Sequence, residues 1–253
     1  MRASNPVWNA KTFAEIAPSR DTVQRMSTDG VVLKTGMLAL LLLVTTTYSW
    51  RVAFAEENPD AAIVLLGWGI FGGLVTGLIV MIWPRSAVFF APVYALFEGL
   101  FLGSISAIFE RAYPGIVIPS VILTFGVLFV MLGVYRTGWI QVTDTFTWGV
   151  TAATGAIALI YLTDLALWWF GYGGVPFVHE GGVLGILFSL VVVGVAALNL
   201  VLDFEFVVQG VQRGAPKYME WVAAFGLMVT IIWVYVEILR FLAKWMGEDD
   251  SDD

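Results

Sequence analysis

Cysteine is absent from this chain of 253 residues, and histidine occurs only once, at His179. Without cysteine there are no disulfides, no thiolate metal ligands and no cysteine nucleophile. One histidine is too few for a haem or zinc site, and an intramembrane protease would need a histidine beside its serine. No phosphate-binding glycine loop or other catalytic arrangement is present. We therefore expect a protein that is not an enzyme, with no cofactor and no certain metal site.

Charged residues are also scarce. They make up 13% of the chain, against about 25% in soluble domains, while 59% of the residues are hydrophobic. A helix needs roughly 20 consecutive apolar residues to cross a bilayer. Seven apolar runs approach or exceed this length, at about residues 33–50, 61–83, 86–109, 115–135, 146–170, 183–207 and 221–243. The runs do not alternate with period two, as membrane β-strands do. The sequence predicts an all-α integral membrane bundle of seven helices in a lipid bilayer.

The ends of the chain differ from the middle. Residues 1–30 are mixed polar and lack the features of a secretory signal, so we expect a cytoplasmic N-terminal arm. Residues 31–246 form the predicted seven-span membrane domain. Residues 247–253 are mostly acidic and are expected to be a disordered tail. No basic patch accompanies stacking aromatics, so nucleic acid is not an expected partner.

The distribution of lysine and arginine between alternate loops predicts the orientation of the chain. Cytoplasmic loops of membrane proteins carry an excess of these residues. Nine lie on the side of the N-terminal arm: Arg2, Lys11, Arg20, Arg25, Lys34, Arg85, Arg136, Arg213 and Lys217. Three lie on the opposite side: Arg51, Arg111 and Lys244. We expect the N-terminus in the cytoplasm and the C-terminus outside.

Glycines recur every four residues within two of the runs. Small residues at this spacing share one helix face and allow close approach of a second backbone. The interpretation favoured here is tight packing inside the bundle, with dimerisation as the alternative. The glycines concerned are Gly69, Gly73 and Gly77 in the second run, and Gly99 and Gly103 in the third.

Carboxylates within the apolar runs are the strongest functional signal. Asp203 lies near the end of the sixth run, where an ionised carboxylate costs roughly 2.5–3.5 kcal/mol on insertion scales. Such a group is usually paired, hydrated or titrated. Asn199 precedes Asp203 by one turn, and Tyr94 precedes Glu98 of the third run by one turn, so each carboxylate has a possible hydrogen-bond partner on its own helix. We favour a functional role for both carboxylates.

Other intramembrane acids have simpler explanations. Glu237 precedes Arg240 by three residues, and the two side chains can pair on one helix face. For Glu237 we therefore keep two alternative roles, a structural ion pair and a gate. Asp164 lies near a pair of tryptophans and is expected to be structural, reaching interfacial water. Glu205 is expected to reach the cytoplasmic interface.

Two long segments resemble a known family. The segment "PVYALFEGLFLGSISAIFE" spans residues 92–110, and "LNLVLDFEFVVQGVQRGAPKYMEWVAAFGLMVTIIWVYVEILRFLA" spans residues 198–243. Both are similar to spans of the Bax inhibitor (YccA-like, TMBIM) family. The shorter motifs "SNPVW" and "VVLKTG", before the first span, resemble a bacterial branch of it. The resemblance covers nearly the whole chain.

The resemblance implies a compact bundle with the seventh helix at the centre, located in the plasma (inner) membrane. It also implies a pH-sensitive calcium leak, in which aspartates on helices six and seven form a hydrogen-bonded sensor. Asp203 matches the first aspartate, and Thr230 stands at the second position. Arg85 is the nearest candidate for the arginine that partners the pair. Two carboxylates share a proton and titrate together, which an Asp–Thr pair does not do.

Two functions follow from these observations. The first is a pH-modulated calcium leak channel gated around Asp203, with transported calcium as the only expected ligand. Its candidate ion- and proton-sensing residues are Asp203, Thr230, Asn199, Glu98 and Glu237. The alternative is a non-transporting membrane regulator that binds a membrane protease or a stress or cell-death partner through the arm at residues 1–30.

Overall fold

The computed structural model describes residues 25–55, 60–179 and 182–249, and the helices in this part account for all seven predicted spans. Each long helix overlaps one apolar run of the sequence. The all-α membrane bundle is therefore confirmed. The long helices are α2 (Thr28–Ala53), α3 (Ala61–Ile82), α4 (Ala87–Ala112), α5 (Val117–Arg136), α6 (Asp144–Trp169), α8 (Gly182–Gln212) and α9 (Met219–Asp249); the short ones are η2 (Pro84–Ser86) and α7 (Pro176–His179).

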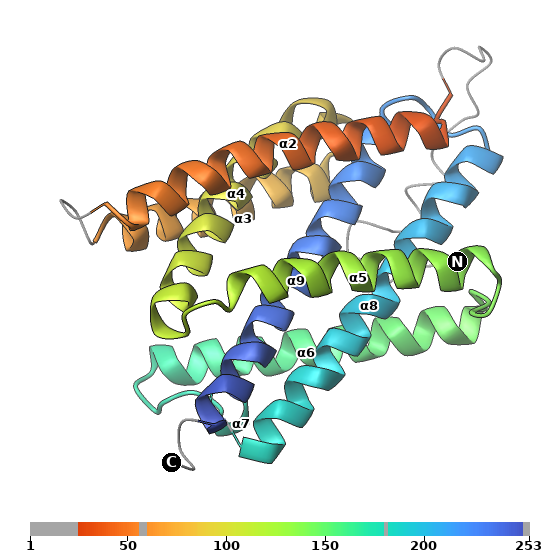
Figure 1. The fold of residues 1–253 in the computed structure, drawn as a ribbon. Coiled ribbons are helices and arrows are strands. Elements are labelled where there is room, and N and C mark those ends of the chain that lie inside the picture. The colour runs from red at the N-terminus through yellow and green to blue at the C-terminus, as the bar shows by residue number, and fades with distance from the viewer. Residues whose placement is uncertain (1–24, 56–59, 180–181, 250–253) are drawn as a thin grey trace.

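Helix α9 occupies the centre of the bundle. It crosses the middle of the molecule in blue in Figure 1 and packs against α2, α4, α5 and α8. In its most apolar stretch 78% of the residues are buried, whereas the corresponding share in the other six long helices is at most 39%. The expectation that the seventh span is central is confirmed. The outer helices keep large apolar side chains exposed, as contact with lipid requires.

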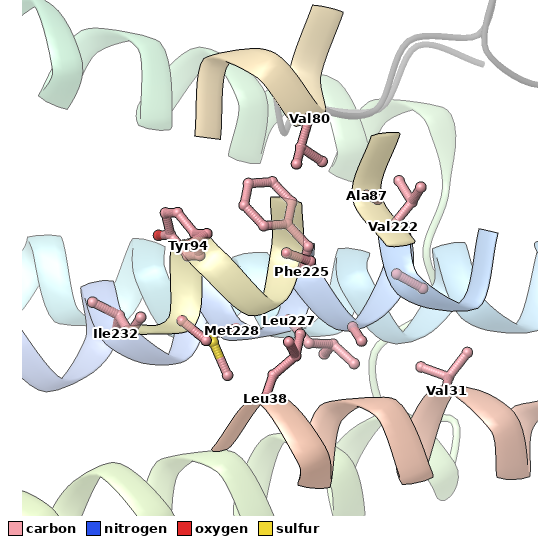
Figure 2. Packing of buried hydrophobic residues seen from close by; sticks show 14 of the residues in the cluster. Val31, Leu38, Val80, Ala87, Tyr94, Val222, Phe225, Leu227, Met228 and Ile232 are labelled. Carbon is pink, nitrogen blue, oxygen red and sulfur yellow. The ribbon is translucent and has the colours of Figure 1, made fainter. Parts of the chain in front are cut away.

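The main core forms where α9 meets the first three spans. Figure 2 shows side chains of α2, α3 and α4 gathered around one stretch of α9. The rings of Tyr94 and Phe225 meet edge to face, with their centroids 4.8 Å apart. Lipid tails are as apolar as these side chains, so hydrophobic burial does not drive the association, and close packing has to stabilise it. The core residues labelled in Figure 2 include Leu38, Val80, Tyr94, Val222, Phe225 and Met228.

The glycines of the second and third spans provide this close packing. A Cβ atom at Gly69 would come within 2.5 Å of the backbone nitrogen of Phe101. At Gly99 and Gly103, a Cβ would clash with the backbone carbonyl oxygens of Leu42 and Thr46. The glycines therefore lie at the α3–α4 and α2–α4 contacts. For these positions, packing inside the bundle is confirmed over the dimerisation alternative.

The two chain ends lie largely outside the described residues. Of the expected arm at residues 1–30, the structure describes residues 25–30, and of the expected tail it describes residues 247–249. The amide of Met26 donates to the carbonyl of Ala215 at 2.7 Å, which joins the start of the described chain to the loop between α8 and α9. The division into arm, membrane domain and tail remains a prediction.

Candidate functional site

Asp203 lies on the buried side of α8, and its residue surface is 2% exposed. It precedes the end of α8 by nine residues, and Thr230 follows the start of α9 by eleven. At 1.5 Å per residue these positions lie about 14 Å and about 17 Å from the shared α8–α9 loop. The two helices are packed neighbours and run in opposite directions. Asp203 and Thr230 therefore lie at similar depth in the bundle.

The polar residues near Asp203 have partners of their own. Asn199 donates from Nδ2 to Thr154 Oγ1 on α6 at 2.8 Å and to the carbonyl of Val195 at 2.9 Å. The amide thus links α8 to α6. The hydroxyl of Thr230 donates to the carbonyl of Gly226, one turn earlier on α9, at 3.2 Å. Both residues are buried, so this depth of the bundle combines a carboxylate, an amide and two hydroxyls in apolar surroundings.

Glu98 lies at a different place, in the contact between α3 and α4. Tyr94, one turn earlier on α4, interacts electrostatically with Glu98. A Cβ at Gly73 of α3 would come within 2.5 Å of Glu98 Oε1, so the carboxylate lies directly against the Gly73 position. Tyr94 in turn packs on Phe225 of the central helix. The described contacts of Glu98 connect it to α3 and, through Tyr94, to α9.

Glu237 lies further along the central helix. It follows Thr230 by seven residues, which is about 10 Å along the axis, and it is 2% exposed. Its Oε1 accepts a hydrogen bond from the hydroxyl of Tyr161 on α6 at 2.9 Å and lies 3.6 Å from Arg240 Nη1. The predicted Glu237–Arg240 pair is confirmed. The structure thus spreads the candidate acids over several helix contacts, with Glu98 between α3 and α4 and Glu237 further along α9 than Thr230.

The structure gives contacts for three other charged residues that the sequence interpretation considered. Asp164 is buried and accepts from the amide of Val175 at 2.7 Å, so it holds the loop after α6. This confirms a structural role, but the expected exposure to interfacial water is wrong. Glu205 bridges two helices, because it accepts from the Tyr135 hydroxyl of α5 at 2.8 Å. Arg85, in η2, lies 6.0 Å above the ring of Tyr218, in the loop before α9.

Sequence reasoning missed Glu220, the acid in the first turn of α9. Its residue surface is 0% exposed. It forms ion pairs with Lys34 of α2 and, at 3.1 Å, with Lys217. The backbone amide and the hydroxyl of Ser27 both donate to its Oε1 at 2.9 Å. The spacing of Lys217 and Glu220 was a visible signal for a local pair, but the contact with α2 depends on the tertiary fold.

A cavity and a buried lysine at the opposite end of α9 were also missed. The cavity has a volume of about 420 Å³ and lies between α4, α7 and α9. Lys244 borders it and is 8% exposed. From sequence we counted Lys244 only as a loop charge. Within the described part of the chain, no cluster of three or more histidines or acids could hold a metal ion.

A bundle of seven apolar helices, one of which is buried at the centre, with carboxylates inside, defines a multi-pass helical membrane protein. Its environment is therefore the lipid bilayer. The sequence model of the Bax inhibitor 1 like family matches residues 5–247. This range covers nearly the whole chain, so the chain belongs to that family, and the family expected from the two long segments is confirmed. Comparison with curated proteins gives no match.

Proposed function

We propose that this protein is a cation leak channel of the plasma membrane, with Ca²⁺ as the transported ion and Asp203 as the controlling group. The N-terminus would lie in the cytoplasm and the C-terminus outside, as the lysine and arginine counts favour. The observation that carries the proposal is the burial of Asp203, at 2% exposure, on the helix packed against the centre of the bundle. Ionisable residues inside membrane spans mark ion and proton pathways more often than structural positions.

Competition between a proton and a cation for one carboxylate would give the pH dependence. Ionised Asp203 attracts a cation, whereas the neutral acid does not. Thr230 lies at similar depth and supplies a hydroxyl, which does not titrate in this range. The response to pH should therefore follow one titrating group and not a coupled pair. Glu98 and Glu237 would act at other places along the same pathway.

Flux measurements on the purified protein test this function directly. The protein is reconstituted into vesicles that contain a calcium-sensitive dye, and influx is followed across the physiological pH range. We expect Asp203→Asn to remove the pH dependence of the influx. Glu205→Gln is the matched control, because it makes the same change two residues away on a side chain that faces Tyr135 of α5; it should leave the dependence intact.

Absence of flux in both the parent and Asp203→Asn would contradict the channel. The regulator would then become the better hypothesis. In that case, deletion of residues 1–24 should abolish capture of a membrane-protein partner while the thermal unfolding of the bundle stays unchanged.

Restoring a second carboxylate gives an independent test of the sensor. In Thr230→Asp, two acids lie at similar depth on packed helices. Their protons should then leave in two steps, so that the pH profile of flux broadens or splits. An unchanged profile would show that position 230 does not communicate with Asp203.

A further inference from the structure

The C-terminal end of α9 carries two basic side chains that are turned toward the protein. Lys244 donates from Nζ to the carbonyl of Phe177 at 3.2 Å and to the carbonyl of Gly185 at 3.1 Å. Arg240 donates from Nη2 to the carbonyl of Val178 at 3.3 Å. These bonds hold α7 and the start of α8 against the central helix; Figure 1 shows α7 beside this end of α9.

The carboxylates that the structure describes near these two cations are Glu237 and Asp164. Carbonyl oxygens accept hydrogen bonds but carry no net charge, so they do not neutralise the two cations. Glu237 Oε1 is 3.6 Å from Arg240 Nη1, and the same carboxylate also attracts the ammonium of Lys244. Asp164, on α6, accepts from the amide of Val175, which is neutral and leaves the negative charge of the carboxylate in place. Two cations that border one cavity favour an anion in it, because opposite charges attract more strongly near a protein surface than in bulk water.

Space for an anion is present beside the same two residues. Arg240 and Lys244 border the cavity of about 420 Å³, and its described lining contains no acid. This volume lies within the range of about 300–1,000 Å³ found for small-ligand sites. The ammonium has a third N–H donor, and the guanidinium has five in total, so donors remain after the described bonds are made. The opposite wall is mostly apolar and includes Ile108 and Phe109 of α4.

We propose that this cavity binds a phosphate group, with Arg240 and Lys244 as its ligands. Cations and an apolar wall together suit the phosphate of an anionic lipid headgroup with part of its glycerol. The cavity also lies at the end of a membrane span, where headgroups are found. Free inorganic phosphate offers the same anionic chemistry without the apolar contact. This binding goes beyond the channel function and does not depend on it.

Thermal unfolding of the full-length protein in neutral detergent tests the site. Short-chain phosphatidylglycerol, phosphatidylcholine with the same chains, and inorganic phosphate are titrated separately. Phosphatidylglycerol is expected to raise the unfolding midpoint by roughly 5–10 °C near saturation, and phosphatidylcholine to leave it unchanged. A rise with inorganic phosphate alone would identify the free ion as the source. Equal effects of the two lipids, or no effect of either anion, would overturn the proposal.

Variants locate the binding. Lys244→Gln should remove most of the rise. Because Lys244 also holds α7, Ala112→Phe provides a second variant that fills the cavity and keeps both cations, and it should remove the rise as well. Arg111→Gln is the control, since Arg111 lies on the same helix as Ala112 but bonds the carbonyl of Ala53 and does not line the cavity. An equal loss in this control would contradict the site.

The acids at residues 248–253 follow the cavity-lining Gly247 in the chain and are the competing occupants. A variant with amides at these positions separates the two cases. A phosphatidylglycerol or phosphate response that appears only in this variant would overturn the proposal, because the chain's own carboxylates would then fill the cavity. A response of similar size in both proteins would support it.

Discussion

The first three spans and the fifth span are joined to their neighbours in different ways. At Gly69, Gly99 and Gly103, glycine allows the backbones of α2, α3 and α4 to touch. The glycines of α6, Gly149 and Gly155, have no other atom within 4 Å of an added Cβ. Helix α6 is connected by side-chain hydrogen bonds instead, from Asn199 to Thr154 and from Tyr161 to Glu237.

This difference separates a fixed part of the bundle from an adjustable one. Backbone contacts through glycine have no rotamers and allow little relative movement, because closer approach creates a clash and separation loses close packing. A hydrogen bond between two side chains can break and re-form as helices move. The side-chain hydrogen bonds of α6 go to Asn199 of α8, four residues before Asp203, and to Glu237 of α9. Helix α9 also carries Thr230. We therefore expect rearrangements that open a pathway to occur between α6, α8 and α9, with α2 to α4 as the frame.

The largest effect is expected at the contact that ties α2 to α9. Glu220→Gln removes the carboxylate that Lys34 and Ser27 surround and leaves a nearly buried ammonium without its partner. Breaking a buried pair from one side typically costs about 3–5 kcal/mol. Unfolding in mixed micelles with increasing denaturing detergent measures the loss. Lys217→Gln is the control, because the Lys217 side chain is 52% exposed, and its removal should cost at most about 1 kcal/mol.

The glycine contacts give the next largest effect. Gly103→Val places two methyl groups against the carbonyl of Thr46 and should destabilise the bundle by about 1–3 kcal/mol through overpacking. Gly155→Val makes the same change on α6, where nothing lies within 4 Å, and should be close to neutral. Both are measured by the same unfolding titration. Equal losses of unfolding free energy in the two variants would contradict the division into a fixed and an adjustable part.

The side-chain hydrogen bonds of α6 should contribute less to stability than the glycine contacts do, and more to function. Tyr161→Phe removes the hydroxyl that donates to Glu237. Hydrogen bonds between membrane helices average about 0.6 kcal/mol, with a maximum near 1.7 kcal/mol. We expect a loss in this range together with faster calcium influx in vesicles, because α6 is released from α9. Tyr235→Phe, which removes the hydroxyl paired with Ser106 of α4 at 2.6 Å, is the control. It should lower stability similarly without changing the influx.

The smallest effect is expected at the bond between α5 and α8. Tyr135→Phe removes the donor to Glu205, which is half-buried and still accepts from Gln209 at 2.7 Å. Because this second partner remains, we expect a loss of no more than about 0.5 kcal/mol in unfolding. A loss above that of Tyr161→Phe would place α5 with the tightly held helices.

Much of the architecture could be predicted from the sequence. Seven apolar runs gave seven helices, since a bilayer leaves helices as the only way for such runs to satisfy their backbone hydrogen bonds. The glycine spacing identified helix faces that pack closely, and the i,i+3 spacing of Glu237 and Arg240 predicted a pair on one helix. The position of the seventh helix at the centre followed from family resemblance, and its burial agrees.

Other features could not be predicted from the sequence, because they involve contacts between residues far apart in the chain. Glu220 contacts Lys34 and Ser27, which are more than 180 positions away in the sequence. Asn199 donates a hydrogen bond to Thr154 of another helix. Lys244 is buried because α7 and the start of α8 pack against the end of α9. The sequence by itself determined the spans and the class through local composition and periodicity, and it indicated the family through the resemblance of two long segments. Only the tertiary structure decided which buried charge meets which partner and where a cavity remains, because those outcomes depend on how separate helices pack.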